Sequence, residues 1–162
     1  PLWSRGLGDV YKRQMYTYWK RSSPHPTMTT FDAPSREKCT ATRPRTNTPL
    51  QALITLNEPQ FVEAARVFAQ RILKEAGPSP TERITFAYRV ALCREPKPGE
   101  ITALSELVLR QKERFGADKK KADELLKIGE SPRDGTIDPV EHASWTILAS
   151  TMFNLDEFLT RN

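Results

Sequence analysis

The sequence predicts a mainly α-helical fold, an irregular helical bundle of about five to six helices behind an extended, proline-rich N-terminal segment. Three observations support this prediction. Prolines recur where helices would begin, apolar residues recur at three- and four-residue spacing from residue 58 onward, and the last periodic segment is apolar on nearly all sides. A chain of 162 residues is long enough for one domain with a sizeable core.

Five prolines mark the expected helix starts, because the first residue of a helix has no intrahelical partner for a backbone N–H. These prolines are Pro49, Pro59, Pro80, Pro98 and Pro139, and the residues expected to cap most of these helices are Thr48, Asn57, Ser79 and Asp138. Asp138 and Glu141 form a capping-box pattern, in which each side chain bonds the other's backbone amide. Gly77 and Gly129 stand where helix ends favour a left-handed residue.

The helix that begins near Glu58 has the clearest amphipathic pattern in the chain. Its predicted buried face comprises Phe61, Ala64, Ala65, Phe68, Ala69, Ile72 and Leu73. Its predicted solvent face comprises Glu63, Arg66, Gln70, Arg71 and Lys74. Further helices are predicted over Pro80–Leu92, Pro98–Phe115, Lys119–Ile128 and Pro139–Phe153, with a final short turn from Leu155 to Leu159. Because Pro139–Phe153 is apolar on nearly all sides, we expect it at the centre of the bundle.

The first fourteen residues differ in character from the rest of the chain. Gly6–Gln14 resembles the translated adaptor read-through that caps metagenomic reading frames, so residues 1–14 are interpreted as a non-native tail. Without this tail, which contributes +2, the formal net charge falls from +5 to +3 and gives little support to a polyanionic partner. Residues 15–48 are predicted to be an extended or loop segment with a short helical turn, packed on a helical domain over residues 49–162.

The loop segment is expected to contain one helical turn. Pro24 and Pro26 remove backbone donors and restrict the residues before them, which predicts that Ser22–Thr30 is not regular helix. Asp32 is expected to cap the short helical turn, at Pro34–Cys39.

The motifs of several enzyme classes are absent, namely a serine nucleophile elbow, a phosphate-binding glycine loop and a dinucleotide fingerprint. His25 and His142 have no second histidine at helical spacing, so no metal site is predicted and His142 is interpreted as a packed or capping residue. No catalytic activity is expected of this fragment alone. No apolar run approaches the length of a membrane span.

The two cysteines, Cys39 and Cys93, form neither a paired-cysteine metal motif nor a haem-attachment signature. They could pair in an oxidising compartment. The favoured interpretation is that they are two small, partly buried hydrophobic residues.

One dense polar cluster lies at the junction between the loop segment and the first helices. Its candidate anion-binding residues are Asp32, Arg36, Arg43, Arg45, Asn47, Thr48, Gln51 and Asn57. Helix N-termini and guanidinium groups suit anions, so Arg43 and Arg45 could hold a small acidic ligand or an acidic patch of a partner domain. The alternative, which we favour, is that these side chains satisfy the backbone of a loop, with Arg36 paired to Asp32.

A nucleic-acid interface is a weaker alternative for the same region. Basic residues lie near the aromatic stretch Tyr16–Trp19 in the sequence, and such a combination can bind single strands. These basic residues are Arg36, Lys38, Arg43 and Arg45. The remaining basic residues alternate with acidic ones along the predicted helices, as on a solvated surface, so we expect no nucleic-acid partner.

Several of these motifs together resemble one family. They are Tyr16-Thr-Tyr-Trp-Lys-Arg, Phe31-Asp-Ala-Pro-Ser-Arg-Glu, Arg43-Pro-Arg-Thr-Asn-Thr-Pro-Leu-Gln-Ala-Leu, Leu56-Asn-Glu-Pro-Gln-Phe-Val-Glu-Ala-Ala-Arg, Ala87-Tyr-Arg-Val-Ala-Leu and Asn154-Leu-Asp-Glu-Phe-Leu. From Met15 onward the chain resembles the C-terminal domain of unknown function of planctomycete surface proteins, the planctomycete cytochrome c-associated family. No reaction is assigned to that family, so no catalytic residue is carried over. Cys39 fits the family pattern, whereas Cys93 stands where a small residue such as glycine is expected, which argues against a disulfide.

The resemblance implies the C-terminal helical module of an exported, multidomain planctomycete-type protein, located in the periplasm or at the cell surface. Such a module would pack against missing upstream domains of the same chain, with Tyr16–Trp19 facing them. Any haem would belong to an upstream domain, because this fragment has no cysteine-pair–histidine site and is expected to hold no cofactor. The alternative function is an anion-binding or catalytic half-site over Arg43–Asn57 for a sulfated or acidic sugar.

Overall fold

The structure is a computed structural model that describes residues 24–35, 37–42, 44 and 46–160. These described residues are mainly helical and contain no β-strand, which confirms the predicted fold class. The chain divides into two compact units, Pro1–Thr46 and Asn47–Asn162. Every helix among the described residues is too short or too polar to cross a bilayer.

The described part of the first unit contains one short helix, α2 (Pro26–Thr30). Pro26 occupies the first turn, where proline is compatible with a helix, and His25 before it is extended. The prediction that Ser22–Thr30 contains no regular helix is therefore wrong. The helical turn expected at Pro34–Cys39 is also wrong, because the described residues of that range form loop and bends.

In the second unit, each of the five prolines predicted to begin a helix does so. The helices are α3 (Pro49–Asn57), α4 (Pro59–Glu75), α5 (Pro80–Leu92), α6 (Pro98–Ala117), α7 (Lys119–Leu126), α8 (Pro139–Phe153) and α9 (Asp156–Leu159). Helix α7 forms although its first turn is basic, because the Asp118 side chain accepts the Lys121 backbone N–H. The proline positions thus predicted the order and starts of the main helices.

The capping box predicted at the start of α8 is only half formed. Asp138 accepts the backbone N–H of Glu141 at 3.0 Å. The Glu141 carboxylate does not return to the Asp138 amide, because its Oε1 accepts hydrogen bonds from Arg83 at 2.7 Å and Lys112 at 3.2 Å. Glu141 therefore links α8 to α5 and α6.

In the second unit, a left-handed backbone conformation follows a helix at Gly129, as predicted, and at Cys93, which was not predicted. Gly129, just beyond α7, has φ +96° as predicted, but Gly77 is not left-handed and α4 ends at an extended Ala76. Cys93 ends α5 with φ 56° and ψ 29°, a conformation that favours glycine. Cys93 and Cys39 are both exposed and free, so their interpretation as partly buried residues is wrong.

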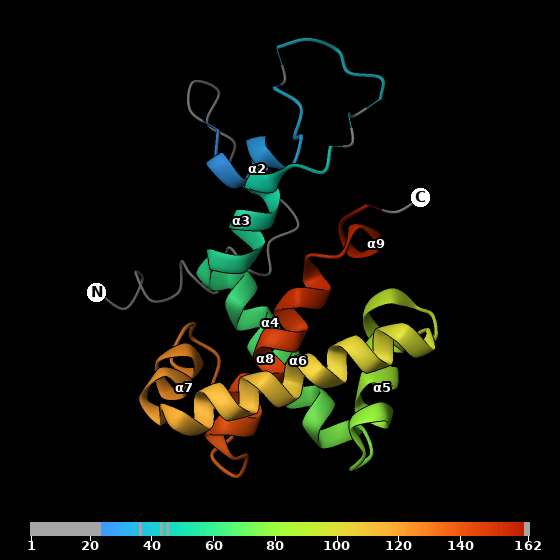
Figure 1. The fold of residues 1–162 in the computed structure, drawn as a ribbon. Helices are drawn as coiled ribbons and strands as arrows, with labels where there is room; N and C mark the ends of the chain where they lie inside the picture. The colour runs from blue at the N-terminus through green and yellow to red at the C-terminus, as the bar shows by residue number, and fades with distance from the viewer. Residues whose placement is uncertain (1–23, 36, 43, 45, 161–162) are drawn as a thin grey trace, which may run out of the picture. The chain divides into compact units, whose positions relative to one another are not determined.

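Helix α8 forms the centre of the second unit, as predicted. It packs against α4 and α6, which cross it in Figure 1, and it also contacts α3, α5, α7 and α9. Ten of its fifteen residues are buried, so it has no solvent face of the ordinary amphipathic kind. The main core comprises Ala65, Ala69, Ile72, Ile84, Ala87, Tyr88, Val108, Trp145, Leu148, Ala149, Met152 and Phe153.

The buried face of α4 differs from the predicted face. Three predicted core residues are fully buried, namely Ala65, Ala69 and Ile72. Ala64, predicted to be buried, is exposed, whereas Glu63 and Arg66, predicted to face solvent, are only 5% and 1% exposed. Two charged side chains of α4 are therefore enclosed by other parts of the protein.

Candidate functional site

The predicted polar junction lies only partly within the described residues, because Arg36, Arg43 and Arg45 fall outside them. Asp32 has a left-handed backbone with φ 57° and caps no helix, so its predicted capping role is wrong. Its carboxylate Oδ2 accepts hydrogen bonds from the backbone N–H and the hydroxyl of Thr46, at 2.9 and 2.6 Å. The pairing of Arg36 with Asp32 stays a prediction.

Four of the predicted site residues lie in the second unit, and the side chain of each already forms a hydrogen bond within the protein. Asn47 Nδ2 donates to Oδ1 of Asp156 at 2.9 Å. Thr48 and Gln51 bond each other's backbone N–H groups at 3.3 and 3.1 Å, which caps α3. Asn57 does not cap α4, because it is the last residue of α3 and its Nδ2 donates to a carbonyl one turn earlier, at 2.8 Å. These contacts support a structural role for the described junction residues, and binding of an acidic ligand stays a prediction.

Helix α3 is inverted relative to an ordinary surface helix. The residues that it buries are polar, since Gln51 is 2% and Thr55 is 1% exposed. Its large exposed residues are leucines that recur every three positions, Leu50 at 55%, Leu53 at 57% and Leu56 at 49%. This spacing places the three leucines on one side of the helix, which we call the leucine face.

A second polar arrangement joins α4 to the loop between α7 and α8. Oε1 of the buried Glu63 accepts hydrogen bonds from the backbone N–H and the hydroxyl of Ser131, at 2.7 and 2.5 Å. Arg66 Nη2 donates to the carbonyl of the same serine at 2.8 Å. Gly129 makes room for this contact, because a Cβ there would lie 2.5 Å from the Glu63 side chain.

The same side of α4 holds the loop at a second residue. Gln70 Oε1 accepts the Asp134 backbone N–H at 3.1 Å, and Lys74 forms an ion pair with the Asp134 carboxylate. Asp134 Oδ1 also accepts the backbone N–H of Thr136 at 2.9 Å, which closes the loop on itself. We call residues 129–136, together with the four α4 side chains Glu63, Arg66, Gln70 and Lys74, the α4 clasp.

His142 is fully buried on α8, which confirms its interpretation as a packed residue. Its Nε2 lies 3.0 Å from the carbonyl oxygen of Arg66. Because a carbonyl oxygen only accepts, Nε2 carries the proton of the neutral ring. Burial lowers the pKa of His142, and the charges of Arg133 and Arg66 lower it further, against the opposing effects of the Arg66 carbonyl and the Asp134 carboxylate. The ring is therefore neutral near pH 7.

The sequence does contain a pattern that fits the clasp, but an amphipathic analysis of α4 assigns that pattern to the solvent face. The four α4 side chains of the clasp recur every three or four residues, and such a polar stripe ordinarily faces solvent. The segment Gly129-Glu-Ser-Pro-Arg-Asp-Gly135 must find partners for its backbone groups wherever it crosses the protein. Pairing the backbone groups of this loop with the polar side chains of the α4 stripe could have predicted the clasp.

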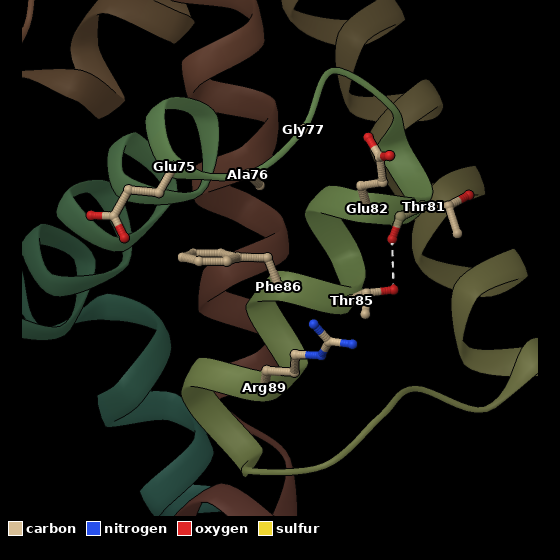
Figure 2. A pocket seen from close by; sticks show the side chains of 8 residues that line it. All are labelled: Glu75, Ala76, Gly77, Thr81, Glu82, Thr85, Phe86 and Arg89. Atoms are coloured by element: carbon tan, nitrogen blue, oxygen red, sulfur yellow. Dashed lines mark hydrogen bonds between the residues drawn. The ribbon is translucent and has the colours of Figure 1, made fainter.

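A surface pocket of about 430 Å³ lies between the end of α4 and the start of α5. Figure 2 shows the Phe86 ring projecting from α5 between the side chains of Glu75 and Arg89. Glu75 and Arg89 each form an ion pair within the protein, at 2.9 and 2.6 Å, and Glu82 accepts a backbone N–H at the start of α5. The charged groups of the pocket thus already have partners, and its lining indicates no particular ligand.

Across the part of the chain that the structure describes, no three His, Cys, Asp or Glu side chains lie close enough together to hold a metal ion. The chain matches no curated protein and no solved structure. It does match the sequence model of one family, described as a protein of unknown function (DUF1553), over residues 4–108, which is more than half of its length. That segment includes the polar junction, the leucine face and the α4 side of the clasp. The chain therefore belongs to the PSD1 family of proteins of unknown function.

Proposed function

We propose that this chain is a helical module that acts in domain packing, with the leucine face of α3 as its contact surface. The observation that carries the proposal is the inversion of α3, which buries Gln51 and Thr55 and leaves Leu50, Leu53 and Leu56 about half exposed. Contiguous exposed apolar residues of this kind mark interaction surfaces, whereas single exposed leucines are ordinary. Burying each half-exposed leucine would contribute about 1 kcal/mol to docking.

The chemistry of α3 indicates what kind of surface it fits. Residues 46–57 contain no ionisable side chain, in a protein in which 28% of residues are charged. The centres of protein interfaces are depleted in charge in the same way. We therefore propose that the leucine face packs on an uncharged apolar surface of another domain of the same polypeptide, upstream of this module.

Cross-linking in the full-length protein tests this proposal. A photoreactive phenylalanine analogue placed at Leu53 should cross-link to a segment outside the 162 residues of this chain, which mass spectrometry would identify. The matched control is the same analogue at Leu109, which is 61% exposed on α6 but has no exposed leucine neighbours of the α3 kind. Equal cross-linking from the two positions, or none from Leu53, would contradict the proposal.

The setting of the module is also a proposal, supported by the motif resemblance given above. We place it at the C-terminus of an exported planctomycete-type protein, in the periplasm or at the cell surface, with any haem in an upstream domain. Fractionation of cells that express the tagged full-length gene tests the location, and a haem absorbance band in the purified protein tests the cofactor. Recovery in the cytoplasm would contradict export.

The alternative function is an anion-binding half-site for a sulfated or acidic sugar at the polar junction. One observation favours it: the Asp32 carboxylate accepts two hydrogen bonds from Thr46, the residue that follows Arg45 in the sequence. Replacing Arg43 and Arg45 with alanine should abolish binding of a sulfated oligosaccharide while the circular dichroism spectrum stays unchanged. Loss of domain docking instead would favour the packing function.

A further inference from the structure

Arg66 connects the clasp loop to the buried histidine. Its guanidinium Nη2 donates to the Ser131 carbonyl at 2.8 Å, and its own backbone carbonyl lies 3.0 Å from His142 Nε2. Arg66 is 1% exposed and His142 is fully buried, so both contacts lie in the protein interior. His142 and the clasp loop are therefore linked through a single residue, Arg66.

The surroundings of His142 suit a neutral ring and not a cation. The charges that act on the ring are those of Arg66 on α4 and of Arg133 and Asp134 in the loop. The neighbouring elements also carry the carboxylates of Glu63 on α4, Asp123 on α7 and Glu141 on α8. All four carboxylates are bonded elsewhere: Glu63 to Ser131, Asp123 to Arg133, Asp134 to Lys74 and Glu141 to Arg83. A proton added at Nδ1 would find no acceptor, because Nδ1 is buried and has no hydrogen-bond partner.

We propose that protonation of His142 releases residues 129–136 from α4, so that the clasp is an acid-sensitive latch. A buried imidazolium without a carboxylate partner is costly, whereas the same cation is well solvated once the loop opens. The guanidinium groups of Arg66 and Arg133 increase that cost, since like charges oppose the second cation. The lowered pKa of His142 is consistent with this mechanism.

Opening of the latch would change the surface that the protein presents. The hydrogen bonds that Glu63 accepts from Ser131 and that Arg66 donates to its carbonyl would be lost, and both side chains would become accessible on α4. The remaining helices need not separate, because α4 and α8 are joined independently through the apolar core that includes Ala65, Ala69 and Leu148. The latch thus differs from general acid unfolding, in which all elements open together.

Hydrogen exchange of the whole chain, measured between pH 7.5 and pH 5, tests this proposal. The Ser131 and Asp134 amides report the latch, and the Gln51 amide in the α3 cap reports the rest of the fold. Protection factors at Ser131 and Asp134 should fall by up to tenfold for each pH unit below about 6.5, down to the lowered pKa of His142. The Gln51 amide should keep its protection over the same range.

The variant His142→Gln provides the matched control, because glutamine can donate to the Arg66 carbonyl but does not titrate. In this variant the loop protection should be independent of pH. NMR titration of the His142 ring in the unaltered protein gives a second readout that needs no variant, and its midpoint should mark the pH at which the fall in loop protection levels off. Constant protection down to pH 5, the same fall in His142→Gln, or a parallel fall at Gln51 would overturn the proposal.

Discussion

The hydroxyl of the buried Thr55 donates to Oδ1 of the part-buried Asn154 at 2.5 Å, in a contact that ties α3 to the end of α8. Asn154 is in turn held by its Nδ2, which donates to the Ser150 carbonyl at 2.9 Å. A nine-residue helix is marginal in isolation, so its orientation depends on such contacts. By fixing the polar side of α3 inward, this pair turns the leucine face outward.

Replacing Thr55 with valine should destabilise the protein by about 1–3 kcal/mol. The change keeps the side-chain shape but leaves Oδ1 of the part-buried Asn154 without this donor. Urea unfolding measures the loss. Thr102→Val is the control, because the Thr102 hydroxyl bonds only an exposed backbone carbonyl and its loss should cost at most about 0.5 kcal/mol. Equal effects of the two substitutions would contradict the assigned role of Thr55.

Replacing Cys93 with glycine should stabilise the protein by about 0.5–1 kcal/mol. Cys93 ends α5 at φ 56°, where a side chain with a Cβ is strained and glycine is not. Thermal or urea unfolding under reducing conditions measures the gain. Cys93→Ala retains the Cβ and should give no comparable gain, so similar stabilisation by alanine would attribute the effect to loss of the thiol.

Replacing Gly129 with alanine should destabilise the protein by about 1–3 kcal/mol. The residue has φ +96°, and its new Cβ would approach three side-chain atoms of Glu63 at 2.5–2.6 Å. Gly135→Ala is the control in the same loop, because a Cβ there would meet no atom within 4 Å. Urea unfolding should separate the two variants, and equal stability would argue against a close contact between Glu63 and the loop.

The ion pair of Arg94 and Glu100 should contribute a loss of stability in strong acid. The hydrogen bond from Arg94 lowers the pKa of Glu100 to about 2 from its ordinary value of 4.5. A carboxyl group whose pKa is lowered by folding stabilises the protein above its ordinary pKa, and that contribution disappears as the pH falls toward 2. Glu100→Gln should therefore flatten the dependence of unfolding free energy on pH between 4.5 and 2.

Glu106→Gln is the control for this pH dependence, since the Glu106 pair with Arg110 is largely exposed and worth little. A pH profile that Glu100→Gln leaves unchanged would contradict the pairing. The Glu100 contribution begins to disappear only as the pH falls below 4.5, whereas the change expected from His142 begins below about pH 6.5.

Proline placement predicted the helical framework because it acts through local backbone chemistry. Pro49 and Pro139 begin helices where the missing N–H has no cost. The same argument fails at Pro26, where the prediction treats proline as a helix breaker although a first-turn proline is equally compatible with a helix start. Proline alone therefore locates a helix boundary but does not tell which side of it is helical.

The burial of polar side chains could not be predicted in the same way, because it depends on distant parts of the chain. Arg66 follows a solvent-face pattern along α4, and only the loop at Ser131, 65 residues later, encloses it. Thr55 and Gln51 are likewise buried by packing of the second unit and not by the pattern of α3 itself. The periodicity of a sequence indicates which residues share one face of a helix, but it does not indicate which other part of the protein covers that face.

The most direct test of the proposed function is the stability of the full-length protein with Leu53 or Leu109 replaced by serine. Both leucines are more than half exposed in the structure, at 57% and 61%. If the leucine face packs on another domain, Leu53→Ser should lower the unfolding free energy by about 1–3 kcal/mol, whereas Leu109→Ser should change it by less than about 0.5 kcal/mol. Equally small effects at both positions would mean that α3 faces solvent and would contradict the account.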